Sequence, residues 1–210
     1  MRFLTQTLAL VLMLLVGFIV GSRYQALMDN VEGLQGLVNV QKARIEGFRS
    51  ENLRLTTLVR LREVLDENRI RLPRSTVETM ANRIELVSRK YSISPDMILA
   101  LIQTESSFDP RALSDQGAMG LMQLLPSTAR EVARELNIRW TGDTILWDPP
   151  TNIEMGTYYL KSLISRFNNV ETALAAYNHG PTRIAEMQAT NLALPLDYTE
   201  RVLSSLPERN

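Results

Sequence analysis

The longest regular pattern in this sequence is a series of ten positions between residues 27 and 59, separated by alternating steps of four and three. Eight of the ten positions are apolar, and no proline occurs from Leu27 to Leu72. A heptad pattern without proline predicts one long helix that forms a coiled coil. The series consists of Leu27, Val31, Leu34, Val38, Gln41, Ile45, Phe48, Asn52, Leu55 and Val59. As a polar residue on this seam, Asn52 is expected to fix the register or the number of chains.

Three glycines within the segment, Gly33, Gly36 and Gly47, weaken this prediction because glycine disfavours helix. The alternative is an amphipathic stalk helix that packs on its own domain or on a partner. In either case we expect residues 23–73 to form a helical stalk. Residues 27–72 would associate with a second copy of the chain or with another protein, and would provide spacing rather than chemistry.

The N-terminus carries an unbroken apolar run at residues 8–20, preceded by Arg2. A helix of about 18 residues is roughly 27 Å long, slightly shorter than a bilayer core but tolerable with local thinning. We expect residues 1–22 to be an uncleaved transmembrane anchor. Because Arg2 and the terminal amine stay inside, the rest of the chain would be exported. A cleaved signal peptide is the alternative, since Val20-Gly21-Ser22 is an acceptable small-residue cleavage site.

The composition excludes several classes of function. Lys+Arg and Asp+Glu balance at 23 each and no basic tract occurs, so nucleic-acid binding has no electrostatic basis. The absence of cysteine removes disulfides, cysteine-ligated zinc and thiol nucleophiles. His179 is the only histidine, which excludes a histidine-rich metal site. We expect neither a metal nor a cofactor.

Helical patterns follow Pro73 to the end of the chain, and no convincing strand pair occurs. Ser75 and Glu78 have the spacing of a capping box, and Ser94-Pro95-Asp96 is a second helix start. Further patterns cover residues 126–136, 152–167, 170–178, 181–190 and 196–206. The sequence therefore predicts an all-α protein with a helical domain at residues 74–210.

Glu105 lies on the apolar stripe of the helix that begins at Pro95. It follows Ile98, Leu101 and Ile102 by seven, four and three residues, so all four share one face. Burial, and the partial negative charge of the helix C-terminus, would both raise the pKa of this carboxyl. A carboxyl that keeps its proton near neutral pH suits a general acid acting on a glycosidic oxygen. The alternative is a glutamate that ends its helix early and is merely solvated.

Four segments together resemble the catalytic domain of soluble lytic transglycosylases, a lysozyme-like family. They occur in the order and spacing of that family, from residue 75 to about residue 206. The segments are "ESSFDP" at 105–110, "ALSDQGAMGLMQLLPSTA" at 112–129, "LWDPPTNIEMGTYYL" at 146–160 and "ALAAYNHGP" at 173–181. Each piece alone is weak, but the combination of "ES", "GLMQ" and "AYN" is specific.

The resemblance implies a role for seven residues. Glu105 would be the single catalytic acid and base, and the substrate-binding residues would be Ser114, Gln123, Leu125, Tyr177, Asn178 and Tyr198. Tyr198 corresponds to a late tyrosine that helps to orient the acid. Two positions depart from the family pattern: Leu125 replaces a frequent methionine, and His179 replaces a small residue. Both concern subsite contacts rather than the acid.

The implied reaction needs no second carboxylate. A retaining or inverting glycosidase requires one, and the nearest in sequence, Asp109 and Asp115, read more simply as turn residues. In the family chemistry the 6-hydroxyl of N-acetylmuramic acid attacks its own anomeric carbon and leaves a 1,6-anhydro ring. A serine hydrolase built on His179 lacks a nucleophile elbow.

We therefore expect a lytic transglycosylase in the bacterial inner membrane. It would span the membrane once, place its domain on the periplasmic side and act on peptidoglycan strands. Two alternatives remain: a hydrolytic lysozyme that uses a second acid to position water, and a non-catalytic scaffold that docks on glycan strands.

Overall fold

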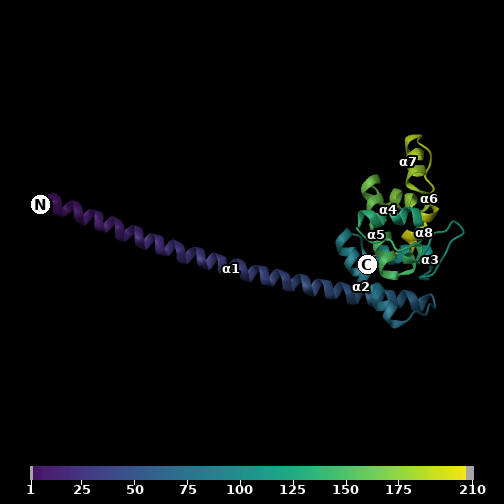
Figure 1. The fold of residues 1–210 in the computed structure, drawn as a ribbon, viewed down its shortest axis with the longest axis horizontal. Coiled ribbons are helices and arrows are strands. Elements are labelled where there is room, and N and C mark those ends of the chain that lie inside the picture. The colour runs from purple at the N-terminus through teal and green to yellow at the C-terminus, as the bar shows by residue number, and fades with distance from the viewer. Residues whose placement is uncertain (1, 207–210) are drawn as a thin grey trace. The chain divides into compact units, whose positions relative to one another are not determined.

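A computed structural model describes the backbone of residues 2–206, with the side chains of residue 8 and of residues 10–206. The chain divides into two compact units, Met1–Glu51 and Asn52–Asn210. The described elements are α1 (Arg2–Glu67), α2 (Arg74–Tyr91), α3 (Pro95–Ser106), α4 (Pro126–Glu135), the 3-10 helix η1 (Asp143–Trp147), α5 (Pro149–Phe167), α6 (Val170–His179), α7 (Pro181–Ala189) and α8 (Asp197–Ser204) (Figure 1). Within residues 2–206 the only β-type contacts are two isolated bridges, Leu113–Met119 and Met119–Leu124, so the all-α prediction is confirmed.

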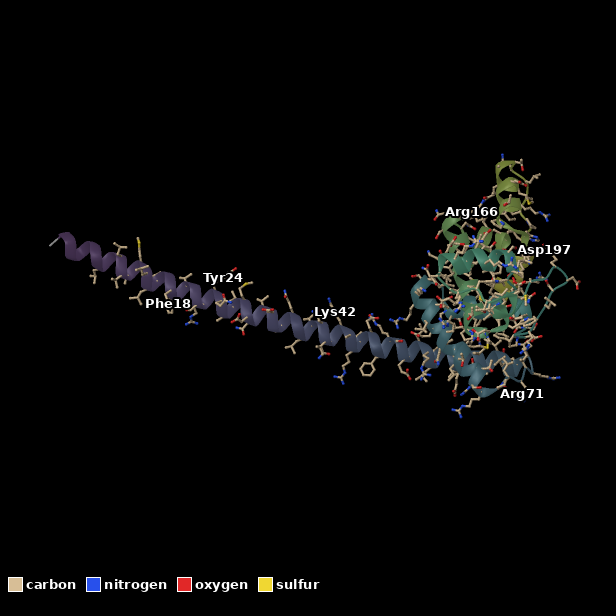
Figure 2. The ribbon with its side chains drawn as sticks, in the orientation of Figure 1. Phe18, Tyr24, Lys42, Arg71, Arg166 and Asp197 are labelled. Atoms are coloured by element: carbon tan, nitrogen blue, oxygen red, sulfur yellow. The ribbon has the colours of Figure 1, made fainter. Side chains whose placement is uncertain are left out.

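The first unit consists of the part of α1 that precedes Asn52. The apolar side chains that the structure describes in this unit are exposed, and Figure 2 shows Phe18, Tyr24 and Lys42 extending from the helix. From Leu10 onward, α1 is long and apolar enough to cross a membrane by length and composition, a test that a signal sequence also passes. The helix prediction for this region is therefore confirmed, while the fate of the N-terminal segment stays a prediction.

The second unit has a single hydrophobic core to which helices α2 to α8 contribute. Helix α5 packs against α2, α4 and α6, and α8 packs against α3 and α6 (Figure 1). The apolar stripe of α2 is buried and consists of Val77, Ala81, Ile84, Val87 and Tyr91. The last turns of α1 belong to this unit too, with Thr57, Leu61 and Leu65 buried. The predicted domain start at residue 74 lies inside the unit and stays a prediction.

Helix starts follow the sequence signals at one of the two places where we expected them. Ser94 caps α3, and its hydroxyl oxygen accepts a hydrogen bond from the Met97 amide at 3.2 Å. The capping box predicted at Ser75 is wrong, because the N-cap of α2 is Pro73, two residues earlier, and no side chain caps the helix. Glu78 instead accepts a hydrogen bond from Arg74 at 2.7 Å.

Candidate active site

Glu105 lies in the last turn of α3, where the helix is stopped abruptly. The next residues, Ser107 and Phe108, adopt left-handed conformations with φ of 50° and 60°. Phe108 is fully buried and turns the chain into the core. The Ser106 hydroxyl donates to the carbonyl oxygen of Leu121 at 2.8 Å, which ties the end of α3 to the following loop. The burial of Phe108 and the hydrogen bond of Ser106 thus fix the backbone that carries Glu105.

The carboxylate of Glu105 meets the last described helix. The Tyr198 hydroxyl, on α8, donates a hydrogen bond to Oε1 of Glu105. Burial raises the pKa of Glu105 from 4.5 to about 7, against the opposing effects of the Tyr198 hydrogen bond and the positive charge of Arg201. The raised pKa predicted from the apolar stripe is therefore confirmed, with burial as its main cause.

A cleft of about 590 Å³ opens in front of Glu105. Six of the seven residues named from the sequence line it: Glu105, Ser114, Gln123, Leu125, Tyr177 and Asn178. Tyr198 lines a neighbouring hollow, shared with Asn178 and His179, and reaches the cleft through its hydroxyl. The structure therefore brings together residues that are up to 93 positions apart in the chain.

The wall that carries Gln123 is a compact loop between α3 and α4. Gln123 has φ of 46°, and its side-chain nitrogen donates to the carbonyl oxygens of Gly120 at 2.9 Å and Ala112 at 3.2 Å. At Gly120, φ is 78° and a Cβ atom would stand 2.2 Å from the carbonyl oxygen of Leu146. Only glycine fits there, so the "GLMQ" segment is held tightly against the rest of the unit.

Asn152, at the start of α5, holds this loop through side-chain hydrogen bonds. The sequence analysis did not single it out. It is fully buried, and its Oδ1 accepts a hydrogen bond from the Met122 amide at 2.7 Å. Its Nδ2 donates to the carbonyl oxygens of Met119 at 3.0 Å and Leu146 at 2.9 Å. The one feature of the sequence that could have indicated this role is the position of Asn152, a polar residue directly before the apolar stripe of a helix.

Tyr177 stands on the opposite side of the same loop. Its hydroxyl donates to the Met122 carbonyl oxygen at 2.8 Å, and its ring centroid lies 5.3 Å from that of Tyr159. Burial, followed by the nearby charge of Glu105, raises the pKa of Tyr177 well above its usual value. Tyr177 is therefore a neutral donor that links α6 to the loop beside the acid.

The two alternative carboxylates differ in position. Asp115 is exposed and lines the cleft, whereas Asp109 lies outside the lining and accepts a hydrogen bond from the Arg111 amide at 2.8 Å. Asp115 is the only carboxylate besides Glu105 among the described residues that line the cleft. Among the same residues, no cluster of three potential metal ligands occurs.

The cleft also contains Gln116, Ala118 and Arg183, to which the sequence analysis gave no role, and His179, which it related to subsite contacts. Burial, and then the charge of Arg183, lowers the pKa of His179, while Asp197 opposes this. The hydroxyl oxygen of Ser114 accepts a hydrogen bond from the Ala118 amide at 3.0 Å, so it supports a turn.

Comparison with known proteins gives a consistent result. Residues 83–195 match the family model described as the Transglycosylase SLT domain. The chain is 39% identical over 112 residues to a transglycosylase of Enterobacteria phage PRD1, covering 53% of this chain and 38% of that one. It is 38% identical over 86 residues to membrane-bound lytic murein transglycosylase C of Serratia proteamaculans, covering 40% and 24%.

A solved structure matches as well. An inactive variant of the lytic transglycosylase Slt of Pseudomonas aeruginosa, in which a glutamate is replaced by glutamine, superimposes with a TM-score of 0.52 at 31% identity. The match covers 58% of this chain and 22% of that one. The present chain thus spans less than two fifths of each relative described here.

Proposed function

Because the chain belongs to the Transglycosylase SLT domain family, we propose that it is a peptidoglycan lytic transglycosylase. Its domain, residues 74–210, cleaves the β-1,4 bond between N-acetylmuramic acid and N-acetylglucosamine without water. The observation that carries this proposal is a single partly buried carboxyl, Glu105, with a pKa of about 7 at the wall of a cleft of about 590 Å³. A replacement of glutamate by glutamine is present in the inactive Pseudomonas relative, which supports a reaction that depends on a glutamate.

In the proposed reaction Glu105 acts twice. It first donates its proton to the glycosidic oxygen, so that the bond from this oxygen to the anomeric carbon breaks and a neutral sugar hydroxyl leaves. The N-acetyl group of the muramic acid stabilises the electron-poor carbon. The 6-hydroxyl of the same sugar then bonds to that carbon and gives its proton to Glu105. The acid is regenerated and the product carries a 1,6-anhydro ring.

The neighbours of Glu105 hold it and the sugar in place. Tyr198 orients the carboxylate through its hydrogen bond, and Tyr177 fixes the loop beside it. Ser114, Gln123, Leu125 and Asn178 are proposed to contact the glycan strand, since they line the cleft. Leu125 is 39% exposed, which suits an apolar contact with a sugar face.

We further propose that residues 1–22 anchor the protein in the bacterial inner membrane, with a single span and the domain on the periplasmic side. The apolar helix and a relative named as membrane-bound support this. Residues 23–73 form the stalk, and residues 27–72 associate with a second copy or with an envelope protein.

A hydrolytic lysozyme is the second candidate, because Asp115 lines the cleft with Glu105 and could position a water molecule. The test is digestion of purified peptidoglycan in ¹⁸O-labelled water with the full chain in detergent, followed by mass spectrometry of the muropeptides. We expect unlabelled anhydro products from the natural sequence and none from Glu105→Gln. Glu186→Gln, at an exposed residue of α7 that does not line the cleft, is the matched control and should retain activity.

The outcomes separate the candidates. Labelled reducing ends that disappear in Asp115→Asn identify a lysozyme and contradict the transglycosylase. Unchanged peptidoglycan, with strands retained by the protein in a pull-down, identifies a docking scaffold.

A further inference from the structure

The apolar seam of α1 is uncovered in a single chain. From Leu27 to Phe48 its six apolar residues are Leu27, Val31, Leu34, Val38, Ile45 and Phe48, and each is between 40% and 66% exposed. Isolated apolar side chains on a surface are ordinary, but six at heptad spacing along one helix form a stripe, interrupted here only at Gln41. Such a stripe is typical of a helix that packs against another helix.

The residue types at alternate seam positions identify the kind of partner. After a step of four come Val31, Val38 and Ile45, which are all β-branched. After a step of three come Leu34, Gln41 and Phe48, and Leu27 starts the series. In heptad terms the first group occupies positions a and the second positions d. β-Branched residues at a with leucine at d favour two parallel strands over three or four, and the seam has this pattern at Leu27, Val31, Leu34 and Val38.

Asn52 supports the same arrangement, because it is the next a position after Ile45. A single asparagine at an a position is the best attested device for fixing both register and chain number, since the two amides can pair only when they lie opposite each other. A partner with an unrelated sequence would leave this amide opposite an apolar side chain. The asparagine therefore favours a second copy over another protein.

The three glycines lie away from the seam. Gly33, Gly36 and Gly47 occupy positions c, f and c, and a Cβ atom added at any of them would meet nothing within 4 Å. They lower the stability of α1 as a single helix but leave the packing face intact. Packing against a partner would therefore stabilise this segment of α1 as a helix.

The charged residues at positions e and g, beside the seam, oppose pairing only weakly. In a parallel pair, position g of one chain faces position e of the next heptad in its partner, which brings Arg44 near Arg49 of the other copy. Each of these arginines has a contact within its own helix. Arg49 pairs with Glu46 at 3.1 Å, and the Arg44 guanidinium lies 5.8 Å from the centroid of the Phe48 ring. Because both arginines have these contacts, the repulsion between Arg44 and Arg49 of the other copy is weak, and it is one such pair in about three heptads.

We propose that residues 27–52 of two copies form a parallel, in-register, two-stranded coiled coil. The parallel direction also follows if both copies enter the same membrane through their N-terminal helices, and to that extent the inference rests on the proposed anchor. It is independent of glycan cleavage and of the identity of the active-site residues.

The test uses the absence of cysteine from the chain. Single substitutions Val31→Cys, Val38→Cys and Ile45→Cys are placed at a positions of the full chain, and Ala43→Cys at position f is the matched control. The membranes are oxidised with copper phenanthroline and analysed on non-reducing gels. In a parallel pair each a-position cysteine lies opposite itself. We therefore expect all three to form covalent dimers at least fivefold more completely than Ala43→Cys.

Other results overturn the proposal. An antiparallel pair would cross-link at no more than one of the three positions, and a seam covered by another protein would cross-link at none. Equal cross-linking at Val38 and Ala43 would indicate random collision. Muropeptide analysis of the same variants is a separate readout, so anhydro products without cross-links would refute pairing and leave the proposed activity intact.

Discussion

Glu105 is subject to opposing influences that together place its pKa close to neutrality. Burial favours the neutral acid, whereas the Tyr198 hydroxyl and the charge of Arg201 favour the carboxylate. A group that must first donate and then accept a proton works best when its pKa is near the working pH. The apolar stripe allowed the burial to be predicted from sequence. The opposing partners lie 93 and 96 residues away on α8, and no local pattern indicates their proximity.

The raised pKa of Glu105 makes stability depend on pH. Since its folded pKa is about 7 against 4.5 as the reference, the fold favours the protonated form. The contribution of this group is fully present below pH 4.5 and is lost as the pH rises through 7. Glu105→Gln cannot ionise. We therefore expect the free energy of unfolding of this variant, relative to that of the natural sequence, to be about 3 kcal/mol higher at pH 8 than at pH 4. Urea unfolding of residues 52–210 at the two pH values measures this.

Tyr198→Phe serves as the companion variant. It removes a hydrogen bond that favours the carboxylate, so the pKa of Glu105 should rise further and the loss of stability should continue to higher pH. Equal stability differences for Glu105→Gln at pH 4 and pH 8 would contradict the burial of this carboxyl.

The loop between α3 and α4 depends on α5 for its shape. Asn152 provides three hydrogen bonds to it and to η1, and Met122 packs against Gly156, where a Cβ atom would stand 2.6 Å from the methionine sulfur. The hydrogen bonds from Asn152 to Met122 and Met119 join residues 30 and 33 positions apart. The helices themselves could be predicted from periodicity and caps, but the shape of the loop could not, because it is set by these distant partners.

Replacing Asn152 should therefore destabilise the domain strongly. Asn152→Leu keeps the volume but leaves the Met122 amide and the carbonyl oxygens of Met119 and Leu146 without their partner. An unsatisfied buried group costs about 1–3 kcal/mol, so we expect a loss of about 3 kcal/mol or more in urea unfolding.

Thr157→Val is the matched control on the same helix. Thr157 is fully buried, and its hydroxyl makes only a weak 3.9 Å contact with the Met122 sulfur. Its replacement should cost less than about 1 kcal/mol. If both variants lost the same stability, the amide hydrogen bonds of Asn152 would not be what holds the loop.

Sequence periodicity did not predict which apolar residues of α1 pack in the core of the second unit. The heptad seam was the stronger pattern on α1, and its residues Leu55 and Val59 are about half exposed in the second unit. A second, shorter stripe of Leu61 and Leu65 is buried there instead. The two stripes follow one another on the same helix, and only the packing shows which of them meets the core.

The second stripe predicts how truncation affects stability. A chain that begins at residue 74 lacks Leu61 and Leu65, whereas one that begins at residue 52 retains them. Burial of each leucine contributes about 1.5–3 kcal/mol, so we expect residues 74–210 to be about 3–6 kcal/mol less stable than residues 52–210. Thermal and urea unfolding of the two segments tests this.

Point variants of residues 52–210 show whether the effect is specific. Leu61→Ala should cost about 2–5 kcal/mol because it leaves a cavity, whereas Val59→Ala, at a residue that is 54% exposed, should change little. Equal stability of the two segments would place the start of the domain at residue 74, as the sequence predicts.

The position of Tyr198 on α8 has a consequence for the order in which the protein is made. A ribosome adds Glu105 93 residues before its hydroxyl partner, and residues 83–195, the part matched by the family model, are complete before Tyr198 is added. A nascent chain thus carries the acid without the group that orients it. The cleft acquires its oriented acid only when α8 docks on α3 and α6, so a chain in which that helix is not yet complete lacks the oriented acid.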